Sequence, residues 1–423
     1  MIMLKVLYNF LVKIFYLPYC FIIIFRRFLG KEHKLKFKEK ILPQKIDRPN
    51  GFLFWFHVAS MGELISILPL IDFFLKKNLK YNFLITTVTL SSFNELKKIY
   101  KNNNRIFHQF LPYDSNLLIN KFFKNWNPDL VSFVDSEIWP NFFLKIKKEN
   151  LPFILLNARI TKKSFDRWSL VRGFASQLFG SLSVSISSNK ETVDYLNYFN
   201  AKKIKYFGNI KFCSSLKSLK EFESNQFDQI SKKNWCAVSI HPGEEIFCGK
   251  VHQIIKKSHS EVMTIIIPRH IHKLKKISSN LKNMGLKVQI KNENDPIEKS
   301  AEIVLVNYYG SVIKYLNKIK QVFFGKSLLV KLKKVGGQNP IDAAKMGCHI
   351  FHGPYVYNFQ EIYEYLNNQE ISEEVNKPEI FAEKLIKNFN SSFKENNKNQ
   401  EKLNDYSNRI FKNVIEEYNK FIT

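Results

Sequence analysis

Short apolar runs alternate with amphipathic stretches along most of the chain. Between residues 50 and 210 the apolar runs are FLFWFH, NFLITT, RIFHQFL, DLVSFVD, PFILLN and LSVSIS, and the stretches between them have the periodicity of helices. Continuous apolar strands flanked by helices are typical of a parallel sheet that helices cover on both faces. Residues 50–210 are therefore predicted to form one doubly wound α/β domain.

A polar stretch rich in Ser and Lys, residues 213–234, interrupts this alternation. The pattern resumes with the apolar runs WCAVSI, VMTIIIP, LKVQI, EIVLV, QVFFG and CHIFHG, which predict a second open sheet. Another polar stretch after residue 390 leads into a final helix. The predicted organisation is an N-terminal segment at 1–30, a Rossmann-like α/β domain at 31–212, a second at 213–395, and a C-terminal helix at 396–423.

The N-terminal segment is apolar but lacks an uninterrupted membrane span. Residues 14–25 are almost wholly apolar, yet Asn9 and Lys13 break the run before a full span of about 20 residues is reached. A basic cluster follows at residues 26–38, and under the positive-inside rule that side faces the cytoplasm. No small-residue cleavage site follows the apolar region, so we expect an uncleaved anchor that either spans the membrane or lies in its interface.

The formal net charge of +28 suggests an anionic partner, such as a membrane or an anionic substrate. Part of this excess reflects a general abundance of Lys, Asn and Ile spread over the surface. No basic stripe with interleaved aromatic residues indicates a nucleic-acid interface. The five cysteines form no C-x-x-C pair, so neither a disulfide framework nor a zinc site is predicted, and a reducing compartment fits.

The loops after the predicted strands of the first domain carry unusual chemistry, and ligands of open α/β sheets bind at that edge. The string HVASMGEL places Glu63 at a helix N-terminus, where an isolated Glu more often complements the helix dipole than acts in catalysis. The string VDSEIWPN holds Asp135, Ser136 and Glu137, for which helix capping by Asp135 or Ser136 is the simpler interpretation. Lys211 follows in GNIKF, after the string NARITKKS.

The second domain carries a comparable set of loops. They are SIHPGEE, the trio Pro268 to His270, NYYGS, and GGQNPID at 336–342. A Gly-Gly loop that opens onto a helix presents free backbone N–H groups to a phosphate, and Arg269 can add a bidentate contact. The dinucleotide fingerprint, the Walker loop and a D-x-D pair are absent from the sequence, so an anion site without a metal is expected.

Taken as an ordered set, these strings resemble the Kdo transferases. These are membrane-associated glycosyltransferases that move 3-deoxy-D-manno-octulosonic acid (Kdo) from CMP-Kdo onto a lipid A precursor. The matching strings are HVASMGEL, ITTVTLSS, LPYDS, DSEIWPN, NARITKKS, GNIKF, SIHPGEE, IPRH, GGQNPID and NFQEI, and they cover nearly the whole chain from about residue 50 to 365.

The resemblance implies a fold of two Rossmann-like domains facing across a cleft (GT-B type). It also implies inverting, metal-independent transfer with CMP-Kdo as donor and no cofactor. The implied acceptor is the lipid A precursor lipid IVA, and the implied location is the cytoplasmic face of the inner membrane, against anionic lipid.

Individual residues carry roles by the same resemblance. Glu63 matches the family's proton acceptor, which takes the proton from an acceptor sugar hydroxyl. Asp135 and Lys211 match positions assigned to transition-state stabilisation. The residues that match CMP contacts are Pro268, Arg269, Tyr309, Gly310, Ser311, Asn339, Pro340, Ile341 and Asp342.

The chain departs from the family pattern at some of these positions. Asp135, Ser311 and Asp342 stand where the family has Glu, Tyr309 replaces Met, and Gln338 replaces His. Two alternatives therefore stay open. One is a related transferase that uses another nucleotide sugar, such as a UDP-activated hexosamine. The other is a non-catalytic membrane-bound binding protein.

Overall fold

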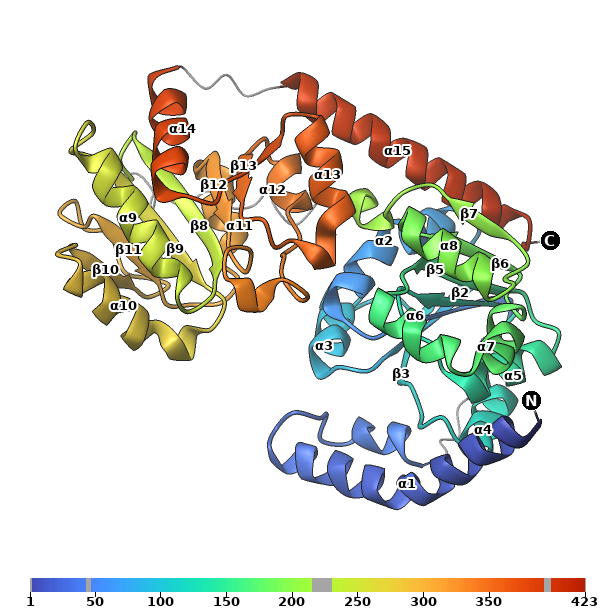
Figure 1. The fold of residues 1–423 in the computed structure, drawn as a ribbon. Helices are drawn as coiled ribbons and strands as arrows, with labels where there is room; N and C mark the ends of the chain where they lie inside the picture. The colour runs from blue at the N-terminus through green and yellow to red at the C-terminus, as the bar shows by residue number, and fades with distance from the viewer. Residues whose placement is uncertain (1, 43–46, 215–229, 392–396, 423) are drawn as a thin grey trace. The chain divides into compact units, whose positions relative to one another are not determined.

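The computed structural model describes residues 2–42, 47–214, 230–391 and 397–422. The chain forms two compact units (Figure 1). Unit 1 comprises Met1–Ser215 together with Tyr406–Thr423, and unit 2 comprises Leu216–Asp405. Within the described ranges, each unit contains one sheet of seven parallel strands, which confirms the predicted class of two parallel-sheet α/β domains.

The sheet of unit 1 has the strand order β3-β2-β1-β4-β5-β6-β7. The order reverses between β1 and β4, which is the position where open α/β sheets bind ligands beyond their carboxyl ends. The strands are β1 (Phe52–Val58), β2 (Tyr81–Thr87), β3 (Ile106–Phe110), β4 (Leu130–Val134), β5 (Phe153–Ala158), β6 (Val184–Ser187) and β7 (Ile204–Tyr206). The helices are α1 (Ile2–Phe28), α2 (Met61–Lys77), α3 (Leu90–Ile99), α4 (Asn116–Trp126), α5 (Pro140–Lys148), α6 (Lys162–Ser169), α7 (Arg172–Phe179) and α8 (Lys190–Tyr198).

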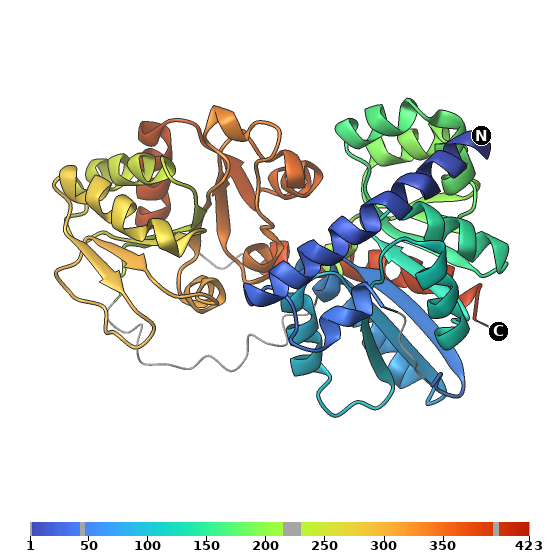
Figure 2. The same cartoon turned by 90° about the horizontal axis from the view of Figure 1, so that it is seen from below.

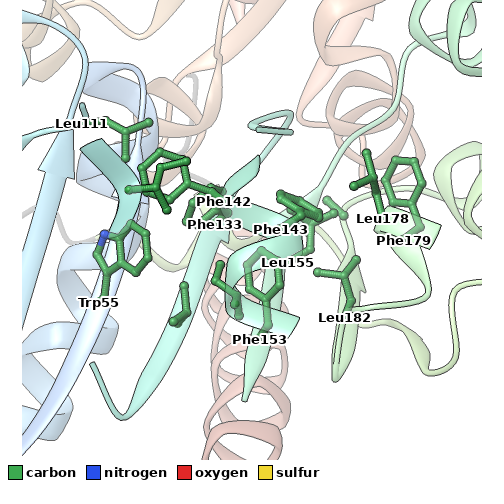
Figure 3. Close-up of a cluster of buried hydrophobic side chains, with 14 of the residues drawn as sticks. Trp55, Leu111, Phe133, Phe142, Phe143, Phe153, Leu155, Leu178, Phe179 and Leu182 are labelled. Atoms are coloured by element: carbon green, nitrogen blue, oxygen red, sulfur yellow. The ribbon is translucent and has the colours of Figure 1, made fainter. Parts of the chain in front are cut away.

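Aromatic side chains fill the core of unit 1 (Figure 3). Trp55 on β1 and Phe133 on β4 lie beside Phe142 of α5, and all three are fully buried. The indole Nε1 of Trp55 donates to the Thr86 hydroxyl at 2.9 Å, so its polar atom is also satisfied inside the core. On the other face, Tyr418 of the last helix, α15 (Asn397–Asn419), donates to the Ser132 hydroxyl at 2.8 Å. Unit 1 is thus closed on both faces of its sheet.

The N-terminal helix α1 is a single helix that lies along one side of unit 1 (Figure 2). Its docked side makes polar contacts along its length. The Tyr8 hydroxyl donates to Asp114 at 2.6 Å, and Tyr113 donates to the backbone carbonyl of Val12 at 3.1 Å. Beyond its end, the buried carboxylate of Glu32 accepts from Lys40 at 2.6 Å. The helix is therefore anchored to its own unit at several points.

The sheet of unit 2 has the order β10-β11-β9-β8-β12-β13-β14, which reverses between β8 and β12. Its strands are β8 (Asn234–Ile240), β9 (Met263–Pro268), β10 (Val288–Lys291), β11 (Ile303–Val306), β12 (Gln321–Phe324), β13 (His349–His352) and β14 (Ser372–Glu374). Its helices are α9 (Glu244–Lys256), α10 (Leu274–Asn283), α11 (Val312–Lys318), α12 (Ile341–Lys345), α13 (Gln360–Asn368) and α14 (Pro378–Asn390).

Candidate active site

Glu63 lies in the first turn of α2, directly after β1. Ser60 caps this helix, because its hydroxyl oxygen accepts from the Glu63 backbone N–H at 3.3 Å. The Glu63 carboxylate reaches back in return: it accepts from the Ser60 hydroxyl and from the Ala59 N–H, each at 2.7 Å. This arrangement is a variant of the capping box. The structure therefore gives Glu63 the helix-terminal role that its position in the sequence suggests.

The same carboxylate has the electrostatics of a base. Glu63 is 9% exposed, and its burial raises the pKa of its carboxyl group. The nearby charge of Asp135 raises this pKa further, and Glu137 adds a smaller contribution, while the hydrogen bonds from Ser60 and Ala59 lower it. A raised pKa makes an ionised carboxylate a stronger proton acceptor. Capping and proton acceptance are thus compatible in one residue.

Asp135 and Lys211 meet beside Glu63 although they are far apart in the sequence. The Lys211 ammonium donates to one carboxylate oxygen of Asp135 at 2.7 Å, and the Asn157 amide donates to the other at 3.2 Å. Asn157 also accepts from the backbone N–H of Ile210 at 2.9 Å, which fixes the short 3₁₀ helix that carries Lys211. Asp135 has a left-handed backbone with φ 62°, a conformation uncommon outside glycine. The three predicted catalytic residues therefore gather at the β1/β4 reversal.

Glu137 and His57 form a second pair of side chains at the same edge. Its carboxylate accepts from the Trp139 indole at 2.9 Å and lies 3.2 Å from the His57 ring nitrogen Nε2. Burial alone raises the pKa of Glu137, but the hydrogen bonds from His57 and Trp139 outweigh it and leave that pKa lowered. Glu137 therefore supplies a fixed negative charge close to Glu63.

The prediction that Asp135 or Ser136 caps the following helix is wrong. Helix α5 begins at Pro140, and Trp139 at its N-cap makes no side-chain capping bond. Instead Asp114, which is distant in sequence, accepts from the backbone N–H groups of Asn141 and Phe142, each at 3.1 Å. Since Asp114 satisfies these groups, Asp135 is available for Lys211.

Asn157, Glu137 and His57 complete this site, and the sequence alone predicts no role for them. They lie in the strings NARITKKS, VDSEIWPN and HVASMGEL, so the signal was present at the level of the loop. Their partners come from other strands, which the sequence does not reveal. Within the described residues, no group of three or more His, Cys, Asp and Glu side chains is arranged to hold a metal ion.

The residues predicted to bind the donor follow the strands of unit 2. Pro268 ends β9, and the exposed Arg269 donates its backbone N–H to Ile240 at 3.1 Å. Tyr309 is 77% exposed after β11, whereas Ser311 is buried and its hydroxyl donates to the backbone carbonyl of Tyr308 at 3.2 Å.

The Gly336–Asp342 loop enters α12 at the same edge. A Cβ on Gly336 would lie 2.0 Å from the Tyr355 carbonyl oxygen, so only glycine fits there. The Asn339 side chain accepts from the Ile341 backbone N–H at 3.1 Å, and burial raises the pKa of Asp342. Across the described part of the chain, no hydrogen bond or ion pair joins this loop to Arg269 or Tyr309. The three predicted segments share an edge without direct bonds.

The chain is similar in sequence to known transferases. Residues 31–214 match the family described as 3-Deoxy-D-manno-octulosonic-acid transferase (kdotransferase). The 3-deoxy-D-manno-octulosonic acid transferase of Rickettsia bellii is 31% identical over 342 residues, which is 80% of each chain. A protein of Arabidopsis thaliana named probable 3-deoxy-D-manno-octulosonic acid transferase, mitochondrial, is 29% identical over 80% of this chain and 76% of its own length.

Solved structures show the same two-domain fold. A putative UDP-N-acetylglucosamine 2-epimerase from Listeria monocytogenes superposes with a TM-score of 0.59 at 12% identity, covering 88% of this chain and 97% of the epimerase. A glycosyltransferase from Rickettsia africae superposes with a TM-score of 0.58 at 14% identity, covering 89% of this chain and 100% of the glycosyltransferase. The predicted fold class is confirmed. By its sequence relatives, the chain belongs to the family of 3-deoxy-D-manno-octulosonic acid transferases, which are glycosyltransferases.

Proposed function

We propose that this enzyme transfers Kdo from CMP-Kdo to a lipid A precursor, lipid IVA, with Glu63 as the base. The observation that carries the proposal is the convergence of Glu63, Asp135 and Lys211 at the β1/β4 reversal of unit 1. These residues come from three separate loops, and their meeting fits the catalytic roles that the family resemblance implies for them. Their meeting gives the site a proton acceptor, a fixed negative charge and an ammonium group.

On the acceptor side, Glu63 takes the proton from a sugar hydroxyl of the lipid while that oxygen attacks the anomeric carbon of Kdo. A new C–O bond forms as the bond to the CMP phosphate breaks, and the electron pair leaves with the phosphate oxygen. The burial and the neighbouring carboxylates that raise the pKa of Glu63 suit it to this proton transfer. A single displacement inverts the anomeric configuration.

Asp135 and Lys211 support this step through their ion pair. Both side chains are largely buried, at 12% and 17% exposure, so the pair keeps its geometry while substrates bind. Lys211 places a positive charge where negative charge develops as the phosphate departs, and Asp135 holds the ammonium in position. With this cation in place, transfer is proposed to proceed without a metal ion.

The test is transfer by purified full-length protein in detergent, given CMP-Kdo and lipid IVA, with the lipid then weighed by mass spectrometry. We expect the lipid to gain the mass of Kdo, equally in the presence of EDTA. Gain of a different sugar from a UDP donor would favour the related transferase. Binding of CMP-Kdo without any product would favour the non-catalytic alternative.

We further propose that α1 attaches the enzyme to the membrane by lying in the interface. This helix is long and apolar enough to cross a bilayer. Its contacts with later parts of unit 1, however, extend from Tyr8, which bonds to Asp114, to Ile23, which packs against Phe37 and Ile41. This is about 22 Å of helix, out of a hydrocarbon thickness of about 30 Å. A spanning α1 would carry Asp114 and its neighbours into lipid, at a high free-energy cost.

The opposite side of α1 has the composition of an interfacial surface. Large apolar side chains such as Phe10, Leu17 and Phe21 are exposed there, and the exposed Lys31 and Lys34 follow at its end. Apolar side chains that enter lipid next to lysines that meet anionic headgroups are typical of interfacial helices.

Two measurements test this proposal: the first shows whether α1 attaches the enzyme, and the second separates a lying helix from a spanning one. Leu17→Glu with Phe21→Glu should abolish flotation with anionic vesicles, whereas Leu79→Glu, at a position 82% exposed elsewhere in unit 1, should not. In right-side-out vesicles, a cysteine introduced at Met3 should stay unlabelled by an impermeant maleimide. Labelling from the outer side would show that α1 spans.

A further inference from the structure

Basic side chains gather at the β8/β12 reversal of unit 2. His241 follows β8, Arg269 follows β9, and Lys326 follows β12. Each of the three central strands of the sheet is therefore followed by one basic side chain. The loops are bonded together: Gly325 donates its N–H to Val238 at 2.8 Å, and Arg269 donates to Ile240 at 3.1 Å. The cluster thus lies where doubly wound sheets bind ligands.

A buried carboxylate holds this edge in shape. Glu244, fully buried in the first turn of α9, accepts from the backbone N–H groups of Lys326 at 2.7 Å, Ser327 at 2.8 Å and His241 at 2.9 Å. Gly325 must be glycine, because a Cβ there would lie 2.8 Å from the backbone Cα of Ile240 and equally close to a Glu244 oxygen. Because both oxygens of the Glu244 carboxylate accept hydrogen bonds from backbone N–H groups, Glu244 fixes the loops without forming an ion pair with Lys326 or Arg269.

Lys326 has a backbone conformation that its side chain does not favour. Its φ is 59°, in the left-handed region that glycine and asparagine tolerate best. Its carbonyl accepts from the N–H of Gly337 at 2.8 Å, which joins it to the Gly336–Asp342 loop. A strained lysine at the ligand-binding edge points to a use for its ammonium group.

The Lys326 ammonium group has the guanidinium of Arg269 as a neighbour. Burial lowers the pKa of Lys326, and the adjacent Arg269 lowers it further. Burial likewise lowers the pKa of His241, to about 4, and the charges of His270, Lys326 and Arg269 contribute. In the described ranges of the chain, no ion pair neutralises Lys326 or Arg269. With His241 neutral, the like charges of Lys326 and Arg269 are stabilised when an anion binds beside them.

We propose that Lys326 is a donor-binding residue that, beside Arg269, contacts an anionic group of the sugar nucleotide. This inference rests on the proposed function, in which the donor carries two anionic groups, the phosphate of CMP and the carboxylate of the sugar acid. Both are oxyanions that an ammonium group binds. The contact adds a binding residue to the segments Pro268–Arg269, Tyr309–Ser311 and Asn339–Asp342.

The substitution Lys326→Gly tests this directly, because it removes the ammonium group and suits the left-handed backbone. If the role of Lys326 is purely structural, the variant should be as stable as the wild type or more stable, and its ligand affinity should be unchanged. The proposal predicts equal or higher stability together with weaker binding. Glu370→Gly, at φ 58° in a turn before β14, controls for the backbone effect. Lys282→Ala, exposed near the end of α10, controls for net charge.

The readouts are CMP affinity by calorimetry and the KM for CMP-Kdo with full-length protein. We expect Lys326→Gly either to lower the affinity for CMP or to raise the KM for CMP-Kdo. The change should be about tenfold at low salt and smaller at high salt, as for loss of one charge-assisted contact. Loss of CMP affinity assigns the contact to the phosphate, and a raised KM for CMP-Kdo alone assigns it to the carboxylate. Unchanged values for both overturn the proposal. Failure of the proposed function is read separately, from wild-type protein that transfers no Kdo.

Discussion

The two sheets differ in strand order, but each reverses its order beside its own first strand, and the carboxyl edges at the two reversals carry opposite charge. In unit 1 the edge beside the strand reversal holds the carboxylates Glu63, Asp135 and Glu137, with Lys211 as the cation. In unit 2 the corresponding edge holds the cations Arg269 and Lys326, and its buried carboxylate Glu244 bonds to backbone N–H groups. One edge is suited to accept a proton and the other to bind an anion.

The difference shows where function resides in this fold. Seven parallel strands and a reversal after the first strand recur in both units, so the scaffold fixes only the place of each site. The loops then set the chemistry, through carboxylates in one unit and through cations and glycines in the other. The comparison predicts that substitutions in unit 1 affect turnover and those in unit 2 affect donor binding.

The largest expected effect is that of Glu63→Gln. The amide keeps the shape of the side chain but cannot accept the proton, so turnover should fall by about two to four orders of magnitude. Glu191→Gln is the matched control, because Glu191 lies in the first turn of α8 at the same edge and bonds to Tyr195. Steady-state transfer assays measure both. Near-normal turnover of Glu63→Gln would remove this residue from the base role.

Lys211→Met should have the next largest effect. The substitution keeps the apolar stem and removes the ammonium group that pairs with Asp135. Loss of such a preorganised cation lowers turnover by about two orders of magnitude. The exposed Lys202 supplies the control, Lys202→Met. Equal turnover of the two variants in the same assay would mean that the ion pair is structural.

A smaller effect is expected in the pH dependence of kcat/KM. Glu63 must be ionised to act, and its pKa is raised, so the rate should rise with pH in a limb above that of an ordinary glutamate. Asp135→Asn removes a neighbouring negative charge and should move this limb to lower pH. Ser60→Ala removes a hydrogen bond to the carboxylate and should move it to higher pH, with about 1 kcal/mol lost in stability. Shifts in the same direction would contradict the electrostatic assignment.

The fold was largely predictable from the sequence, because buried parallel strands are continuous apolar runs. The exceptions are β7, with the sequence IKY, and β14, with SEE. Both are three-residue strands at a sheet edge, partly exposed and partly polar, so they lack the apolar signal. The cap of α5, a helix that begins at Pro140 within VDSEIWPN, was also predicted wrongly. Asp114, which accepts from the first N–H groups of this helix, comes from another loop.

The candidate site was predictable only in its components. The sequence placed Glu63 at a helix N-terminus and Lys211 in a loop, and family resemblance supplied their roles. The sequence did not reveal that Lys211 pairs with Asp135 across 76 positions. Nor did it reveal that Asn157 bonds both to Asp135 and to the backbone next to Lys211. Such contacts depend on strand order, which local patterns do not contain. The left-handed backbone of Lys326 is likewise a property of the folded loop.

The central claim is that unit 1 performs the chemistry and unit 2 binds the donor. Measuring single-turnover Kdo transfer and CMP affinity in parallel for Glu63→Gln and Arg269→Ala tests it most directly. We expect Glu63→Gln to lose transfer while keeping wild-type CMP affinity, and Arg269→Ala to lose CMP affinity while transfer recovers at high donor concentration. The reverse pattern, with weakened CMP binding in Glu63→Gln and normal CMP binding in Arg269→Ala, would contradict this division.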